Sequence, residues 1–249
     1  MSRMKFMNIE IDNLTMDEAL GRIDELIKEN KNSYVVTPNV DHIIQIERGG
    51  GLVEAYQHAD LILTDGKPLI WISKWYGTPI KEKISGSDLF PKLCYLASKR
   101  GYKMFFLGAA EGVASRAAEK LTQRFPGLQV VGTYSPPKGF ENNTEEMSRI
   151  KSLIKKLRPH ILIVALGCPK QELFIYNNRE ELGVPISLGL GASLDFEAGE
   201  IKRAPKWMAN HGLEWVYRIT QDPKRLAKRY LIDDSRIFKL AIKYKKEKS

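Results

Sequence analysis

The chain has 249 residues, of which 43% are hydrophobic and 28% are charged, and its formal net charge at pH 7 is +9. This composition is typical of a globular protein, and the lack of any run of 18 or more apolar residues excludes a bilayer-spanning helix. The two cysteines, Cys94 and Cys168, have no CxxC spacing, so the sequence predicts neither a disulfide framework nor a zinc site.

Short apolar runs alternate with helical patterns along the first 200 residues. Strands are predicted at residues 34–37, 61–64, 103–107, 129–132, 160–166 and 185–188. Helices are predicted at residues 16–29, 68–75, 89–99, 112–125, 145–157 and 171–178. This alternation predicts an α/β fold, in which a Rossmann-like parallel sheet carries helices on both faces.

The last fifth of the chain holds the whole charge surplus. Residues 201–249 contain 14 Lys and Arg against 5 Asp and Glu, whereas residues 1–200 contain 25 of each sign. Apolar side chains recur there at helical spacing, at Leu226, Tyr230, Ile237, Ala241 and Tyr244. We therefore predict two units: an α/β domain over residues 1–199 and a basic, amphipathic, helical appendage over residues 200–249.

Basic helices with interleaved Trp and Tyr side chains suit more than one partner. An anionic membrane surface is one, because the rings would lie at headgroup depth and the cations on lipid phosphates. Nucleic acid is another polyanion that such a segment attracts. A third interpretation is an ordinary amphipathic helix that packs on the α/β domain and keeps its lysines in solvent.

In an open parallel sheet, ligands bind beyond the carboxyl ends of the strands, so residues that follow the predicted strands are candidate site residues. Thr37 and Asn39 follow the first run. Either Asn39 or Asp41 is expected to cap a helix. Thr37 and whichever of these two residues does not cap the helix would then be free to face a ligand.

The second strand is followed by Asp65 and Gly66. Gly66 permits a tight turn that presents Asp65 at the end of the sheet, where apolar flanks would raise the pKa of its carboxyl group. A general base needs this combination of reach and partial desolvation. The alternative is that Asp65 caps the helix that begins near Pro68.

Two glycine-containing junctions predict anion binding at helix N-termini. Gly108 begins a run of small residues before a helix, where backbone N–H groups could approach a phosphate or ribose. The more specific junction begins at Gly167 and places Pro169 in a first helical turn. It offers phosphate, uracil or ribose contacts from Lys170, Gln171 and Glu172.

Several familiar signatures do not occur in the sequence, including GxxxxGK[ST], GxSxG, HExxH and an Asp-x-Asp after a strand. The pair Asp233-Asp234 lies in the basic segment and is interpreted as solvated. An enzyme acting on nucleotide-sugars would therefore use helix dipoles with Arg or Lys, and no bound metal, to stabilise the leaving group.

Eight motifs occur in the order found in one enzyme family. They are Thr37-Pro38-Asn39, Thr64-Asp65-Gly66, Gly86-Ser87-Asp88, residues 166–172, Arg203-Ala204-Pro205-Lys206-Trp207, residues 212–218, residues 222–226 and Arg229-Tyr230. On these motifs, which span nearly the whole chain, the sequence resembles the WecG/TagA/CpsF glycosyltransferases.

The resemblance implies a metal-independent, inverting transferase without a cofactor, peripheral to the cytoplasmic face of the cell membrane. Such enzymes move a sugar from a UDP-sugar donor to a polyprenyl-diphosphate-linked sugar acceptor. In the teichoic-acid branch the donor is UDP-N-acetylmannosamine and the acceptor is undecaprenyl-diphosphate-N-acetylglucosamine. One alternative is the same chemistry with another donor, UDP-N-acetylmannosaminuronic acid or UDP-glucose, for a capsule or exopolysaccharide. A second alternative, from a different class of protein, is a nucleic-acid-binding module with a basic arm.

The resemblance also implies roles for single residues. Asp65 would be the general base, Thr37 and Asn39 would position the sugars, and Gln171 with the turn at residues 167–172 would hold the nucleotide. Further contacts to substrate or diphosphate are expected from Gly66, Lys83, Gly108, Arg203, Arg218, Arg225 and Arg229. Lys83 stands where the family leads us to expect Arg, and lysine lacks the bidentate fork of arginine. A homo-oligomer is also compatible with the family.

Overall fold

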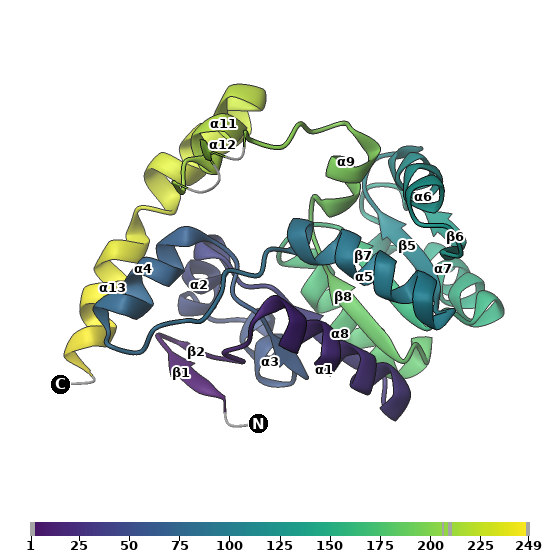
Figure 1. Ribbon diagram of the computed structural model, residues 1–249, viewed down its shortest axis with the longest axis horizontal. Coiled ribbons are helices and arrows are strands. Elements are labelled where there is room, and N and C mark those ends of the chain that lie inside the picture. Colours follow the sequence, from purple (N-terminus) through teal and green to yellow (C-terminus); the bar gives the residue numbers. More distant parts are fainter. Residues whose placement is uncertain (1–2, 206, 209–210, 248–249) are drawn as a thin grey trace.

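The structure, a computed structural model, describes residues 3–205, 207–208 and 211–247, apart from the side chain of Arg225 (Figure 1). Its centre is a six-stranded parallel sheet with strand order β4-β3-β8-β7-β5-β6. In that order the strands span Leu61–Ile62, Ser33–Val36, Ile186–Gly189, Ile161–Ala165, Lys103–Gly108 and Gln129–Tyr134. The predicted α/β fold with a parallel sheet is therefore confirmed.

Alternating side chains of the central strands build two cores, one on each face of the sheet. Val35 of β3 and Ile163 of β7 point to the first face, which is covered by α1 (Met16–Glu29), α5 (Gly86–Arg100), α6 (Val113–Arg124) and α9 (Ser193–Ala198). Val36 and Leu162 point to the second face. That face is covered by α2 (Val40–Glu47), α3 (Gly51–Gln57), α4 (Lys67–Trp75), α7 (Thr144–Leu157) and α8 (Lys170–Leu182). The two-sided burial explains why the strands are almost continuously apolar.

The predicted elements were incomplete. The short helices α2, α3 and α9 were not among them. An antiparallel hairpin of β1 (Met4–Phe6) and β2 (Ile9–Ile11) was also missed, because its strands have only three residues each. The strand predicted at residues 61–64 is paired only over Leu61–Ile62, since it lies at the sheet edge. The helix predicted at residues 171–178 continues to Leu182, where Gly183 ends it in the left-handed conformation.

Helices also form the C-terminal part of the chain, as predicted. They are α11 (Glu214–Gln221), α12 (Pro223–Lys228), the π-helical turn η2 (Arg229–Asp233) and α13 (Arg236–Lys246). Helix α13 runs beside α4 in Figure 1, and Ile237 and Ala241 are buried in the core of the second face. Its far end is fixed to α2, because Lys243 and Tyr244 donate to the carboxylate of Glu47 at 2.8 and 2.6 Å.

In the part of the chain that the structure describes, no helix combines the length and the apolar composition needed to cross a membrane.

Candidate functional site

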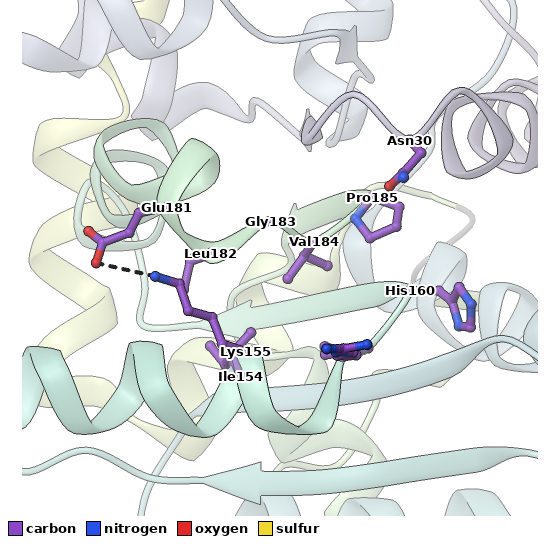
Figure 2. Close-up of a pocket in the computed structure, with 11 residues that line it drawn as sticks. Asn30, Ile154, Lys155, His160, Glu181, Leu182, Gly183, Val184 and Pro185 are labelled. Carbon is purple, nitrogen blue, oxygen red and sulfur yellow. Dashed lines mark ion pairs between the residues drawn. The ribbon is translucent and has the colours of Figure 1, made fainter.

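The two ends of the sheet carry hollows of different character. At the amino ends of β7 and β8, a hollow of about 370 Å³ lies among the C-terminal ends of α1, α7 and α8 (Figure 2). Glu181, which lines this hollow, forms ion pairs with Lys151 at 2.7 Å and with Lys155 at 3.6 Å. None of the predicted site residues lines this hollow.

A larger cavity, of about 630 Å³, lies beyond the carboxyl ends of β4, β3, β8 and β7 and is bordered by the C-terminal helices. Most of the predicted site residues line it together, although they come from distant parts of the chain. They are Thr37, Asn39, Asp65, Gly66, Lys83, Gly167, Gln171, Arg218 and Arg229. Residues selected because they follow predicted strands are thus brought together in one cavity.

Five predicted residues do not line this cavity: Gly108, Pro169, Lys170, Glu172 and Arg203. Gly108 ends β5, one strand further out, where a Cβ atom would overlap the carbonyl group of Ala165. Lys170 pairs with Glu141. A sixth predicted residue, Arg225, has its side chain outside the described part of the chain.

Asp65 lies half-buried at the edge of the cavity, in the turn between β4 and α4. Its backbone N–H donates to the carbonyl oxygen of Pro38 at 2.8 Å, which ties this turn to the end of β3. The N-cap of α4 is Gly66, with a φ of 101° and no side-chain capping hydrogen bond, so the interpretation of Asp65 as a helix cap is wrong. Its carboxylate is free to face the cavity.

Burial raises the pKa of Asp65 to about 6. Lys83 and Arg218 oppose this rise, whereas the carboxylates of Glu214 and Asp88 add to it. A carboxyl group with this pKa is largely ionised at neutral pH and can still bind a proton readily, which is the property required of a general base.

Lys83 interacts with Asp65 through its charge and forms an ion pair with a second carboxylate. Its Nζ lies 3.1 Å from Oδ2 of Asp88, which also accepts from the hydroxyl of Ser85 at 2.6 Å. Burial lowers the pKa of Lys83, but the charges of Asp65 and Asp88 outweigh it and raise the pKa overall. Lys83 therefore keeps its positive charge beside the cavity. Arg203 lies behind this group, paired with Asp88 at 3.0 Å.

Asn39 has a structural role as well as a place in the cavity. Its Oδ1 caps α2 by accepting from the backbone N–H of Asp41 at 3.0 Å and of His42 at 3.4 Å. Asp41 is therefore the residue that does not cap the helix, and it lines the cavity as expected. Thr37, at the end of β3, lies on the same wall.

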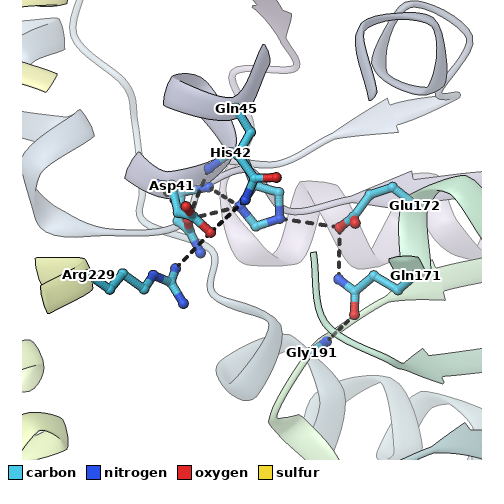
Figure 3. A network of polar contacts seen from close by, with 8 residues as sticks. Asp41, His42, Gln45, Gln171, Glu172, Gly191 and Arg229 are labelled. Atoms are coloured by element: carbon cyan, nitrogen blue, oxygen red, sulfur yellow. Dashed lines mark hydrogen bonds and ion pairs between the residues drawn. The ribbon is translucent and has the colours of Figure 1, made fainter. Parts of the chain in front are cut away.

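Gln171 belongs to a network that reaches from α8 to α2 (Figure 3). Its Oε1 accepts from the backbone N–H of Gly191 at 2.9 Å, and its Nε2 donates to Oε1 of Glu172 at 2.8 Å. The same Glu172 oxygen lies 3.2 Å from Nε2 of His42. Sequence analysis missed His42, because no motif contains it.

The C-terminal helices contribute cations and one unexpected acid. Arg229 pairs with Asp41 across the cavity at 3.4 Å and lies 3.9 Å from Asp234. Asp234 was interpreted as solvated, and this was wrong: it is 9% exposed, and burial raises its pKa to about 6 against the opposing charge of Arg229. The guanidinium of Arg218 lies 5.8 Å from the ring centre of Phe196.

The chain matches the model of the glycosyl transferase WecG/TagA/CpsF family over residues 4–249. It belongs to this glycosyltransferase family. It is 32% identical over 199 residues, 80% of this chain and 75% of the relative, to the N-acetylglucosaminyldiphosphoundecaprenol N-acetyl-beta-D-mannosaminyltransferase of Bacillus spizizenii. The protein of the same name from Staphylococcus aureus (strain MW2) is 27% identical over 229 residues, 91% of this chain and 88% of that protein.

One group of side chains in this glycosyltransferase offers atoms of the kind that bind metals. His42, Cys168 and Glu172 present one such atom each, all within 4.8 Å of one another. Burial, reinforced by the charge of Glu172, raises the pKa of the Cys168 thiol. Burial therefore favours the protonated thiol over the thiolate.

Proposed function

We propose that this glycosyltransferase moves N-acetylmannosamine from UDP-N-acetylmannosamine to undecaprenyl-diphosphate-N-acetylglucosamine, with inversion, in wall teichoic acid assembly. The names of the two relatives support the sugar and the acceptor. The observation that carries the proposal is Asp65, a carboxylate with a pKa raised to about 6 at the edge of a cavity lined by cations.

In the proposed reaction, Asp65 accepts the proton of the acceptor hydroxyl while that oxygen bonds to the anomeric carbon of the donor. The bond from this carbon to the UDP oxygen breaks, and UDP leaves with the bonding electron pair. Attack from the face opposite the leaving group inverts the anomeric centre. A single carboxylate serves such a direct displacement, because no covalent sugar–enzyme intermediate has to form.

The leaving diphosphate needs positive charge. We propose that Lys83, Arg218 and Arg229 provide it, since all three line the cavity with Asp65. Fixed cations in a partly desolvated cavity stabilise developing negative charge without reorganisation. The remaining roles proposed are sugar positioning for Thr37 and Asn39, and nucleotide contacts for Gly167 and Gln171.

An apolar surface at the mouth of the cavity supports a lipid-linked acceptor. It consists of exposed side chains on α4 and the C-terminal helices: Trp71, Trp75, Leu231, Ile232, Phe238 and Ile242. Trp71, Leu231 and Phe238 also line the cavity. Lys74 and Lys239 are exposed on the same two helices, α4 and α13.

Aromatic side chains flanked by cations suit the interface of an anionic membrane. We therefore propose that residues 200–249 form an appendage that, together with α4, places the cavity of the domain at residues 1–199 on the cytoplasmic membrane face.

The test is UDP release from UDP-N-acetylmannosamine in EDTA, with and without a polyprenyl-diphosphate-N-acetylglucosamine acceptor. UDP-N-acetylglucosamine, UDP-glucose and UDP-N-acetylmannosaminuronic acid serve as parallel donors. The proposal predicts acceptor-dependent release with UDP-N-acetylmannosamine, undiminished by the chelator. Faster acceptor-dependent release with another donor would refute the donor, and no release with any donor would refute the transfer reaction.

A further inference from the structure

The surroundings of Glu172 suit a residue that orients neighbouring side chains and do not suit one that contacts the substrate. Its side chain is fully buried and does not line the cavity. Oε1 is shared by two neighbours, Gln171 at 2.8 Å and His42 at 3.2 Å, whereas Oε2 is buried without a hydrogen-bond partner. A buried carboxylate is costly unless the groups around it compensate its charge. The position therefore has to be explained by what Glu172 does to its neighbours.

Towards α8, the carboxylate determines which way the amide of Gln171 points. Because Nε2 donates to Glu172 and Oε1 accepts from Gly191, neither end can be exchanged without losing both bonds. The space around it is also tight, since a Cβ atom on Gly189 would lie 3.1 Å from Nε2 of Gln171. A cavity-lining amide is thus held in a single orientation.

Towards α2, the carboxylate acts through the imidazole of His42. Nδ1 of this ring lies 2.8 Å from Oδ1 of Asn39, which must be the oxygen because it accepts from the N–H of Asp41. The backbone N–H of Asn39 also donates to Nδ1, at 3.3 Å, which completes the capping box of α2. On its other side the ring faces Glu172 through Nε2, so one imidazole joins the N-terminus of α2 to the buried carboxylate.

We infer that Glu172 and His42 are positioning residues, which lock the cavity-lining side chains of Gln171 and Asn39 into one frame across the ends of β3, β8 and β7. The frame is visible in Figure 3 as a continuous chain of contacts from Gly191 to α2. It joins residues that are 130 positions apart in the sequence. This inference rests on the proposed function, because it assigns Gln171 to the nucleotide and Asn39 to the sugars.

Glu172→Ala tests the frame, with Glu172→Gln as the conservative variant and Glu180→Ala as the matched control. Glu180 lies on the same helix with 74% of its side chain exposed. We expect Glu172→Ala to lower kcat/KM on the order of 10- to 100-fold, since displacement of substrate-positioning groups has effects of this size. Glu172→Gln keeps an acceptor oxygen and should recover part of the loss, and Glu180→Ala should behave as the wild type.

A double-mutant cycle separates positioning from a loss of folding. If Glu172 acts through Gln171, Gln171→Ala adds little to the loss in kcat/KM already caused by Glu172→Ala. Fully additive losses, or unchanged kcat/KM per folded molecule in Glu172→Ala, would overturn the inference. If Glu172→Ala does not fold, His42→Gln takes its place in the cycle, with Asn39→Ala as its partner.

The network can also be observed without turnover, so failure of the proposed reaction would not obscure the result. In the wild type, NMR of the histidine rings should show a hydrogen-bonded N–H proton on Nε2 of His42, because the carboxylate of Glu172 accepts from it. Glu172→Gln should weaken this Nε2–H signal selectively. A wild-type ring without an N–H proton on Nε2 would contradict the frame, whatever the enzyme transfers.

Discussion

The two ends of the sheet are both charged and hollow, but their charges are arranged for different purposes. At the amino end, Lys155 lies in the last turn of α7, where a cation offsets the helix dipole, and it pairs with the exposed Glu181. At the carboxyl end, Asp65 and Asp234 are desolvated beside cations, and their pKa values rise to about 6. The two ends therefore differ in how far their charged groups are removed from solvent, and desolvated carboxylates beside cations mark the carboxyl end as the candidate site.

The largest expected effect is that of Asp65→Asn. Loss of a general base should lower kcat by about 10²- to 10⁴-fold. The melting temperature should not fall, because the substitution removes a carboxylate whose raised pKa shows that ionisation is unfavourable in the folded state. Asp17→Asn, at an exposed position in the first turn of α1, is the control. Near-normal turnover by Asp65→Asn would remove Asp65 from the mechanism.

Arg229→Ala should have the next largest effect. The loss of a cation at the diphosphate should lower kcat/KM by about 10²-fold. The substitution also leaves Asp41 and Asp234 without their shared partner, so the pKa of Asp234 should rise further. Steady-state kinetics and carboxyl NMR would measure the two effects. Arg236→Ala, at an exposed position of α13, is the matched control, and an equal loss there would mean that the effect is not local.

The apolar surface at the cavity mouth gives a smaller, separable prediction. Trp71→Glu combined with Phe238→Glu should weaken sedimentation with vesicles of phosphatidylglycerol and phosphatidylcholine by about tenfold or more, because both rings are lost from the interface. Tyr95→Glu is the control, since Tyr95 is equally exposed at 54% but lies on α5, on the other face of the sheet. Equal binding by both variants would place the membrane surface elsewhere.

The smallest effect is expected at the amino end of the sheet. Glu181→Gln breaks ion pairs with Lys151 and Lys155, but Glu181 is 53% exposed. The free energy of unfolding should therefore change by less than about 1 kcal/mol, as measured by urea denaturation. Turnover should be unchanged. A loss of turnover would show that the two ends of the sheet are coupled.

Local signals explain which parts could be predicted from sequence. Helix α1 was predicted with its observed ends from its helical pattern of apolar residues. The structure shows a capping box of Thr15 and Glu18 at its start and Asn30 at its end. Thr37 and Asp65 were found because they directly follow apolar strands. His42 could not be found in this way, since its contact with Glu172 exists only once β3 and β7 flank β8. The burial of Asp234 likewise depends on how α13 packs on α2, which a local pattern does not encode.

The pH dependence of kcat/KM for the acceptor tests the role of Asp65 most directly. Only the ionised carboxylate can accept the proton. The value of kcat/KM should therefore fall about tenfold per pH unit below a midpoint at a pH of about 6, and it should level off above that pH. The diphosphate of a nucleotide-sugar has no ionisation in this range. Asp234 also has a pKa of about 6 and lines the cavity, so the same profile is measured in Asp234→Asn, where the midpoint should remain. A profile that stays flat from about pH 5 to pH 8 would contradict catalysis by Asp65.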